Sequence, residues 1–140
     1  MSIASRARPR AAVDSLRHVL KPRRAESALI ILSHSPFDGD TTWNALRLAS
    51  TLQDQGVAVR LFVMNDATDL VRRGAMPEGS EFDLQAMLRG LLPKGGRVKV
   101  CTTCVNRCGM SAGEVLPETP LATMDDLAQW VAGSDRVVTF

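Results

Sequence analysis

The chain is poor in several residue types that proteins use for structure and binding. Its 140 residues contain no tyrosine, two histidines and only 4% aromatic side chains. Aliphatic residues and methionine must therefore fill most of the core, for which a hydrophobic fraction of 45% is sufficient. Cysteine is also scarce. Because its number is odd, at three, the chain cannot form a disulfide framework in which every cysteine is paired.

Two further absences concern the location of the protein. No apolar run approaches the ~18 residues that a membrane-spanning helix needs, and the N-terminus lacks the apolar region of a secretory signal. We therefore expect a soluble, cytoplasmic protein with no membrane partner. In such a reducing compartment, clustered cysteines are more often metal ligands or reactive thiols than structural disulfides.

Charge is distributed unevenly along the chain. Residues 1–26 hold seven basic side chains against two acidic ones, whereas the remaining residues hold 10 basic and 13 acidic ones. We interpret residues 1–26 as a basic, partly disordered N-terminal arm and residues 27–140 as one α/β domain. A basic segment can contact nucleic acid, but no aromatic residues alternate with these arginines, so the sequence argues against such a site.

The hydrophobic pattern beyond the arm alternates between strands and helices. Apolar runs predict strands at residues 28–33, 57–64, 97–101 and 135–140, with one short strand near 114–116. Strands that alternate with helices of about ten residues imply a mostly parallel sheet of about five strands. The expected fold is therefore a three-layer α/β/α arrangement, with helices on both faces of the sheet.

Helices are predicted by the spacing of apolar residues and by their end signals. One helix lies between Asp40 and Gly56, a short one covers about 68–73, and another covers about 84–91. A last helix should begin with a capping box at Thr123 and Asp126. Its buried face is predicted to comprise Leu127, Trp130 and Val131.

All three cysteines lie in the stretch VKVCTTCVNRCGM, as Cys101, Cys104 and Cys108. This stretch begins as the third of the longer predicted strands, so Cys101 falls at the carboxyl end of a strand. Parallel sheets gather ligands and reactive groups at that edge. His34 and Asn65 follow the first two strands and should lie at the same edge.

Three kinds of chemistry are compatible with this cluster. A zinc or iron site would need a fourth ligand, for which only His34 is suitably placed. A dithiol redox pair is suggested by the C-x-x-C spacing of Cys101 and Cys104, although a helix that begins at the first cysteine is not evident. A nucleophilic thiol, the third reading, must react as a thiolate.

Several residues near Cys101 could stabilise such a thiolate. A turn that leads into a helix N-terminus would direct backbone N–H groups at the sulfur. Arg107 could add a positive charge, while small polar contacts could come from Thr102, Thr103 and Asn106.

The chain also resembles the DsrE/DsrF-like family, which includes the sulfur-relay proteins of the TusD and YchN types. The likeness covers about residues 27–140 and rests on four stretches. These are ALIILSHSPFDGD with the helix TTWNALRLASTLQDQG, the strand VAVRLFVMND, EFDLQAMLRGLL followed by GGRVKVCTTCVNRCGM, and ATMDDLAQWVAGSDRVVTF.

The family's reactive cysteine ends the third long strand, in a pattern like C-x-x-[CA]-x-x-x-R-G. Cys101, Cys104 and Gly109 match this pattern, but Cys108 stands where many members have arginine, with Arg107 one position earlier. The resemblance implies that Cys101 accepts sulfane sulfur as a persulfide and passes it on. Cys104 would then be a resolving or partner thiol.

The resemblance further implies the partners of the chain. It predicts sulfur donor and acceptor proteins, and a homo-oligomer (trimer or hexamer) or a hetero-oligomer with related subunits. The expected function is a persulfide carrier or sulfurtransferase subunit of a sulfur relay or sulfur oxidation pathway, with no metal and no organic cofactor. A zinc, iron or dithiol module built on the three cysteines stays open, as does a non-catalytic assembly subunit.

Overall fold

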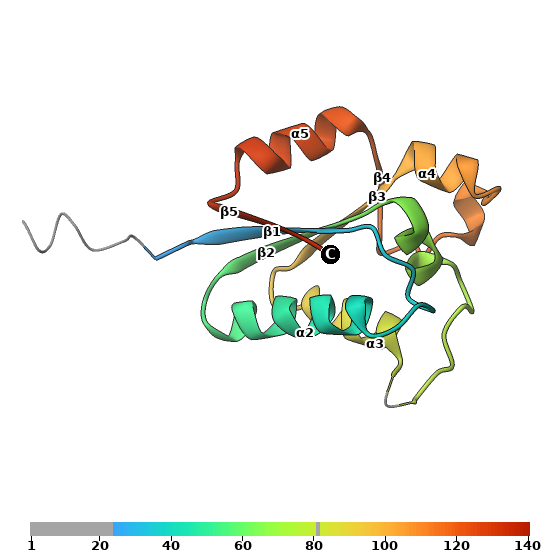
Figure 1. Ribbon diagram of the computed structural model, residues 1–140, viewed down its shortest axis with the longest axis horizontal. Helices are drawn as coiled ribbons and strands as arrows, with labels where there is room; N and C mark the ends of the chain where they lie inside the picture. Colours follow the sequence, from blue (N-terminus) through green and yellow to red (C-terminus); the bar gives the residue numbers. More distant parts are fainter. Residues whose placement is uncertain (1–23, 81) are drawn as a thin grey trace, which may run out of the picture.

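The computed structural model describes residues 24–80 and 82–140 (Figure 1), so the arm predicted at residues 1–26 lies almost entirely outside the described residues. Five parallel strands form one sheet in the spatial order β4-β3-β2-β1-β5. They are β1 (Ser27–Leu32), β2 (Ala58–Val63), β3 (Arg97–Cys101), β4 (Leu121–Ala122) and β5 (Arg136–Thr139). The predicted parallel sheet of about five strands is confirmed.

Helices cover both faces of this sheet, which gives three layers (Figure 1). Helices α2 (Thr41–Asp54) and α3 (Leu84–Leu91) lie on one face, and α5 (Met124–Ala132) lies on the other. The 3₁₀ helix η1 (Asn65–Val71) follows β2, the short helix α4 (Thr102–Arg107) follows β3, and the 3₁₀ turn η2 (Ala112–Glu114) comes next. The elements η1 and α4 thus lie at the carboxyl ends of β2 and β3.

Strand sequences account for this layering. The central strands β1 and β2 pair in parallel from Ser27 opposite Ala58 to Leu32 opposite Val63. They are almost continuously apolar because helices bury both of their faces. Alternate residues therefore contribute to two separate cores. The larger core lies beneath α2 and α3, and the smaller one packs Phe62 against Trp130 of α5.

Three details of the fold differ from the sequence predictions. The short strand expected near residues 114–116 forms at β4 instead, and Val115 makes only an isolated bridge to Arg72. The helix expected at about 68–73 begins earlier, as η1 at Asn65. Val131, which was assigned to the buried face of α5, is 42% exposed, because that face turns only Leu127 and Trp130 inward.

No helix in the described part of the chain is both long enough and apolar enough to cross a membrane.

Candidate functional site

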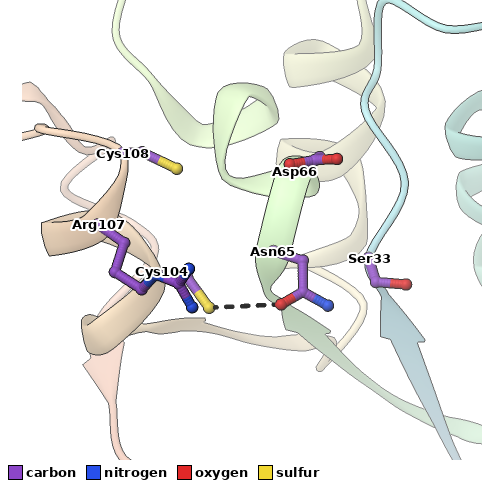
Figure 2. A pocket seen from close by; sticks show the side chains of 6 residues that line it. All are labelled: Ser33, Asn65, Asp66, Cys104, Arg107 and Cys108. Atoms are coloured by element: carbon purple, nitrogen blue, oxygen red, sulfur yellow. Dashed lines mark hydrogen bonds between the residues drawn. The ribbon is translucent and has the colours of Figure 1, made fainter.

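The carboxyl ends of β1, β2 and β3 surround a pocket of about 500 Å³. Figure 2 shows the side chains of α4 on one side of this pocket and those that follow β1 and β2 on the other. The lining residues are Ser33, Asn65, Asp66, Cys104, Arg107 and Cys108. Two of the three cysteines therefore meet polar groups from neighbouring strands at the edge where parallel sheets bind ligands.

Cys101 lies at the junction of β3 and α4. It is the N-cap of α4, and its Sγ accepts a hydrogen bond from the backbone N–H of Cys104 at 3.3 Å. A helix that begins at the first cysteine was not evident from the sequence, but α4 does begin immediately after Cys101. This hydrogen bond fixes the Cys101 sulfur at the start of α4, beside the backbone of Cys104.

The end of α4 depends on Gly109. This residue has φ of 70°, and the N–H of Met110 returns to the carbonyl of Val105 at 3.1 Å. Glycine adopts this left-handed conformation without a Cβ clash, so it can end a helix here. The termination places Cys108 at the C-cap of α4, one turn after Cys104.

Exposure increases along the three cysteines. Cys101 is only 6% exposed and packs in the smaller core with Leu29 and Phe62. Cys104 is half-buried at the rim of that core, and Cys108 is exposed. All three thiols are free. They are therefore chemically distinct, although they occupy one short stretch of chain.

Cys104 is held between Cys101 and Asn65. Its thiol donates to the side-chain oxygen of Asn65 across 3.8 Å, as the dashed line in Figure 2 marks. Burial raises the pKa of the Cys104 thiol, and the adjacent Cys101 thiol raises it further. Cys104 is therefore mostly protonated at neutral pH, which makes it a slow nucleophile until it loses its proton.

Cys108 contacts η1 rather than the interior. Its Sγ lies 3.4 Å from the hydroxyl of Thr68, a buried residue whose own hydroxyl donates to the carbonyl of Asn65. The 3₁₀ helix η1 thus contacts both thiols that line the pocket, Cys104 through Asn65 and Cys108 through Thr68.

Asn65 has an unusual backbone conformation. Its φ is 49°, the left-handed region, and it is the one residue other than glycine with positive φ in the described ranges 24–80 and 82–140. Asparagine tolerates this region better than most residues. The turn points its amide toward Cys104 as the chain leaves β2.

Arg107 and Asp66 give the pocket one charge of each sign. Arg107 extends alongside Cys104 from α4, and Asp66 lies on η1 opposite it (Figure 2). Within the described ranges, Arg107 forms no ion pair. A cation next to a half-buried thiol can stabilise negative charge on sulfur as it develops.

The other predicted site residues lie outside the pocket. The Thr102 hydroxyl donates to the carbonyl of Ala122 at 3.0 Å, which ties α4 to β4. Thr103 and Asn106 are exposed and do not line the pocket. His34 contacts Asp38, with its Nε2 3.1 Å from the backbone oxygen and 3.3 Å from the carboxylate.

The ligand geometry of the described residues does not favour the metal alternative. Across residues 24–80 and 82–140, no group of three or more histidine, cysteine or acidic side chains is placed to hold a metal ion. His34, proposed as the fourth ligand, turns to Asp38 and does not line the pocket with the cysteines.

Sequence reasoning missed three features of this pocket. Asp66 directly follows Asn65 after a predicted strand, where an acidic residue is most simply a turn or capping residue, but it lines the pocket. Ser33, which immediately follows β1, and Thr68, which touches Cys108, were not singled out. Ser33 could have been found from its position, because it is a polar residue at the carboxyl end of a buried strand. No sequence signal identifies Thr68.

Comparison with known proteins gives consistent sequence matches. A model of the DsrE/DsrF-like family matches residues 26–140. Protein YchN of Escherichia coli (strain K12) is 33% identical over 117 residues, which cover 82% of this chain and 99% of YchN. The uncharacterized protein MK0008 of Methanopyrus kandleri is 30% identical over 119 residues, which cover 85% and 98% of the two chains.

Solved structures share the same fold. The crystal structure of Escherichia coli YchN superposes with a TM-score of 0.75 at 32% identity, over 82% of this chain and 99% of that one. Protein BT1422 of Bacteroides thetaiotaomicron reaches a TM-score of 0.65 over 82% of this chain and 95% of that one. At 14% identity, this second match shows the fold alone.

Proposed function

Because this chain belongs to the DsrE/DsrF-like family, we propose that it is a persulfide carrier or sulfurtransferase subunit of an intracellular sulfur relay. Cys101 holds the sulfane sulfur in this proposal. The observation that carries it is the position of the Cys101 thiol. The thiol ends β3 at the carboxyl edge of the sheet and receives the N–H of Cys104, with two further thiols on the adjoining helix.

The proposed chemistry is thiol exchange. A thiolate attacks the outer sulfur of a donor persulfide, a new S–S bond forms, and the old bond breaks with its electron pair left on the donor thiolate. Burial of Cys101 suits storage, because a persulfide at a 6% exposed position is shielded from water and from competing thiols. Arg107 and the N–H of Cys104 are the groups placed to stabilise negative charge at the cluster.

The partners of this function are proteins that donate and accept sulfur. Assembly as a homo-oligomer, trimer or hexamer, or with related subunits stays a prediction. So does a cytoplasmic location. Light scattering of the purified full chain would measure its mass in solution and test the assembly.

The test is to load the protein with sulfur and to measure the resulting increase in its mass. Incubation with sodium polysulfide, followed by gel filtration, should leave a stable adduct of one sulfur atom on Cys101. Cys101→Ser should lose the stable adduct, because the buried thiol is removed, whereas Cys108→Ser should retain the adduct. A wild-type protein that gains no sulfur on any cysteine would contradict the proposed function.

A second function is favoured by one observation. Cys101 is the N-cap of α4, and Cys104 stands three residues later with its N–H on the Cys101 sulfur. This arrangement would allow a dithiol redox pair. Titration against glutathione buffers, with the loss of two hydrogens followed by mass, tests this function. A pair that stays reduced in the most oxidising buffer excludes it.

A further inference from the structure

The buried position of Cys101 poses a problem for sulfur transfer. Thiol exchange requires the attacking sulfur to reach the sulfur that it attacks. Cys101 is 6% exposed, packs against Leu29 and Phe62, and is not among the residues that line the pocket. A cysteine on a partner protein therefore has no direct path to it.

Cys108 is accessible to such a partner. It is exposed, and it lines the same pocket as Cys104. The two residues lie one turn apart on α4, where the N–H of Cys108 donates to the carbonyl of Cys104 at 3.0 Å. The Cys108 thiol points toward η1 (Figure 2). The hydroxyl of Thr68, a residue of η1, lies 3.4 Å from the Cys108 sulfur.

Cys104 stands between the exposed and the buried thiol. Its N–H is 3.3 Å from the Cys101 sulfur, and its own thiol lines the pocket with Cys108. The pKa of Cys104 is raised by burial and by contact with Cys101, while the Cys108 charge contributes in the same direction. Cys104 is therefore influenced by both of the other thiols, and the exposure of the three cysteines falls in order from Cys108 to Cys101.

We propose that Cys108 is the entry thiol of a three-cysteine relay, in which sulfane sulfur passes from a partner's persulfide to Cys108, then to Cys104, and finally to Cys101. This relay rests on the proposed function, because it supplies the buried carrier. It also assigns a role to the cysteine that stands in place of the arginine expected from the family pattern.

Each step moves one sulfur atom between two thiols. The Cys108 thiolate attacks the outer sulfur of the partner's persulfide, and the electron pair of the broken S–S bond stays on the partner's thiolate. The Cys104 thiolate then attacks the outer sulfur on Cys108, and the Cys101 thiolate attacks it on Cys104. The hydrogen on the outer sulfur travels with it. Protons lost by attacking thiols and regained by leaving thiolates exchange with water, so no step needs an oxidant or a reductant.

A persulfide can reach between thiols that lie one helical turn apart. Residues four apart on a helix have Cβ atoms about 5–6 Å apart, which strains a direct disulfide within one helix. A persulfide adds one S–S bond of about 2 Å, so its outer sulfur can reach the neighbouring thiol after a side-chain rotation. Transfer of the outer sulfur is therefore easier between Cys104 and Cys108 than a disulfide.

The experiment uses a bulky donor, a cysteine desulfurase supplied with cysteine, and follows each thiol over time. Samples are quenched with an alkylating reagent and digested with trypsin. Cleavage after Lys99 and Arg107 places Cys108 on a different peptide from Cys101 and Cys104, and fragmentation separates the latter two. In the wild-type protein, sulfur should appear on Cys108 first and accumulate on Cys101.

Two variants test the order of transfer. Cys108→Ser should slow the loading of Cys101 about tenfold or more, because the bulky donor loses its accessible thiol. Cys104→Ser should leave sulfur on Cys108 without delivery to Cys101. The control combines Cys108→Ser with Ala112→Cys, which restores an exposed thiol outside the pocket. This control should be as slow as Cys108→Ser alone.

The outcomes separate the relay from the proposed function. If Cys101 loads at the wild-type rate in either single variant, or if the Ala112→Cys control restores the rate, the relay is wrong and the carrier stands. Sulfur that loads Cys104 or Cys108 but never reaches Cys101 overturns both the relay and the choice of carrier. A wild-type protein that takes up no sulfur from either the desulfurase or polysulfide overturns the proposed function.

Discussion

Two helices of this protein begin directly after neighbouring parallel strands, and their N-cap residues are of different types. Helix α4 follows β3 with Cys101 as its N-cap, and α5 follows β4 with Thr123 as its N-cap. In both, the side chain of the cap accepts the N–H of the residue three positions later, at 3.3 Å. The two helices thus share one capping geometry but use different atoms.

Helix α5 adds a second contact that α4 lacks. The N–H of Thr123 donates to the Asp126 carboxylate at 2.8 Å, which completes a capping box. Threonine is a favoured N-cap residue, and cysteine is not among the favoured ones. Helix α5 therefore begins with groups that stabilise the helix. In α4 the same position holds the thiol that we propose as the sulfur carrier, and a proposed functional residue at this position is consistent with the absence of a favoured cap.

The largest expected difference concerns thiol reactivity at α4. Because burial and the Cys101 thiol raise the pKa of Cys104, its thiolate fraction should grow about tenfold per pH unit across the neutral range. The alkylation rate of Cys104 should therefore still be rising at a pH where a free cysteine has levelled off. Iodoacetamide labelling, with each cysteine quantified by peptide mass, measures this rate.

A matched variant sharpens this first prediction. Cys101→Ser removes the second cause of the raised pKa and leaves the burial of Cys104 in place. The pH profile of Cys104 should shift partway toward that of a free cysteine. The groups around this thiol are Cys101 and the other residues that line the pocket, which are Ser33, Asn65, Asp66, Arg107 and Cys108. A profile that matches free cysteine in the wild-type protein would contradict the prediction.

A smaller effect is expected from the cap of α5. Thr123→Ala should lower the free energy of unfolding by about 1 kcal/mol, because the N–H of Asp126 loses its acceptor. Urea denaturation followed by the fluorescence of the two tryptophans, one of which is Trp130 on α5, measures the change. Sulfur loading of Cys101 should be unaffected.

Thr103→Ala is the matched control for that measurement. It makes the same substitution in the first turn of α4, where Thr103 is exposed and outside the pocket. Its effect should stay within about 0.5 kcal/mol. Equal losses for the two variants would mean that the box at α5 adds nothing, and the comparison between the helices would fail.

The same pair of helices shows what could be predicted from the sequence. The capping box at Thr123 was predicted correctly because all of its determinants lie within four residues. Strand β3 was also predicted to the residue, as the stretch RVKVC that follows Gly96 and ends at the first cysteine. The start of α4 was not evident, because the C-T-T-C stretch contains weak helix formers and its N-cap position is held by cysteine, which is not a favoured cap residue.

The arrangement of the cysteines depends on residues distant in sequence. Leu29 and Phe62, from β1 and β2, bury Cys101, and no feature of residues 98–110 reveals that contact. The strand order β4-β3-β2-β1-β5 was equally inaccessible, because periodicity gives each strand but not its neighbours. The family resemblance predicted the fold and the edge where the thiols lie, but not their graded exposure.

The smallest predicted effect concerns Asp126, the acidic residue of the capping box at the start of α5. The backbone N–H of Thr123 is the main cause of the lowered pKa of Asp126, with its hydroxyl next and Lys99 contributing less. A lowered pKa means that the carboxylate stabilises the fold above its unfolded-state pKa, and that this contribution is lost as the pH falls through the folded-state pKa. Asp126→Asn should therefore destabilise the protein at neutral pH and lose this effect in acid. Urea denaturation of the wild-type and Asp126→Asn proteins at several pH values measures the difference.

The control is Asp125→Asn, which removes a charge from the same turn without changing the capping box. A destabilisation by Asp126→Asn that does not change with pH would show that the charge of Asp126 is irrelevant to the cap, and α5 would then depend on the Thr123 hydroxyl alone, as α4 depends on one thiol.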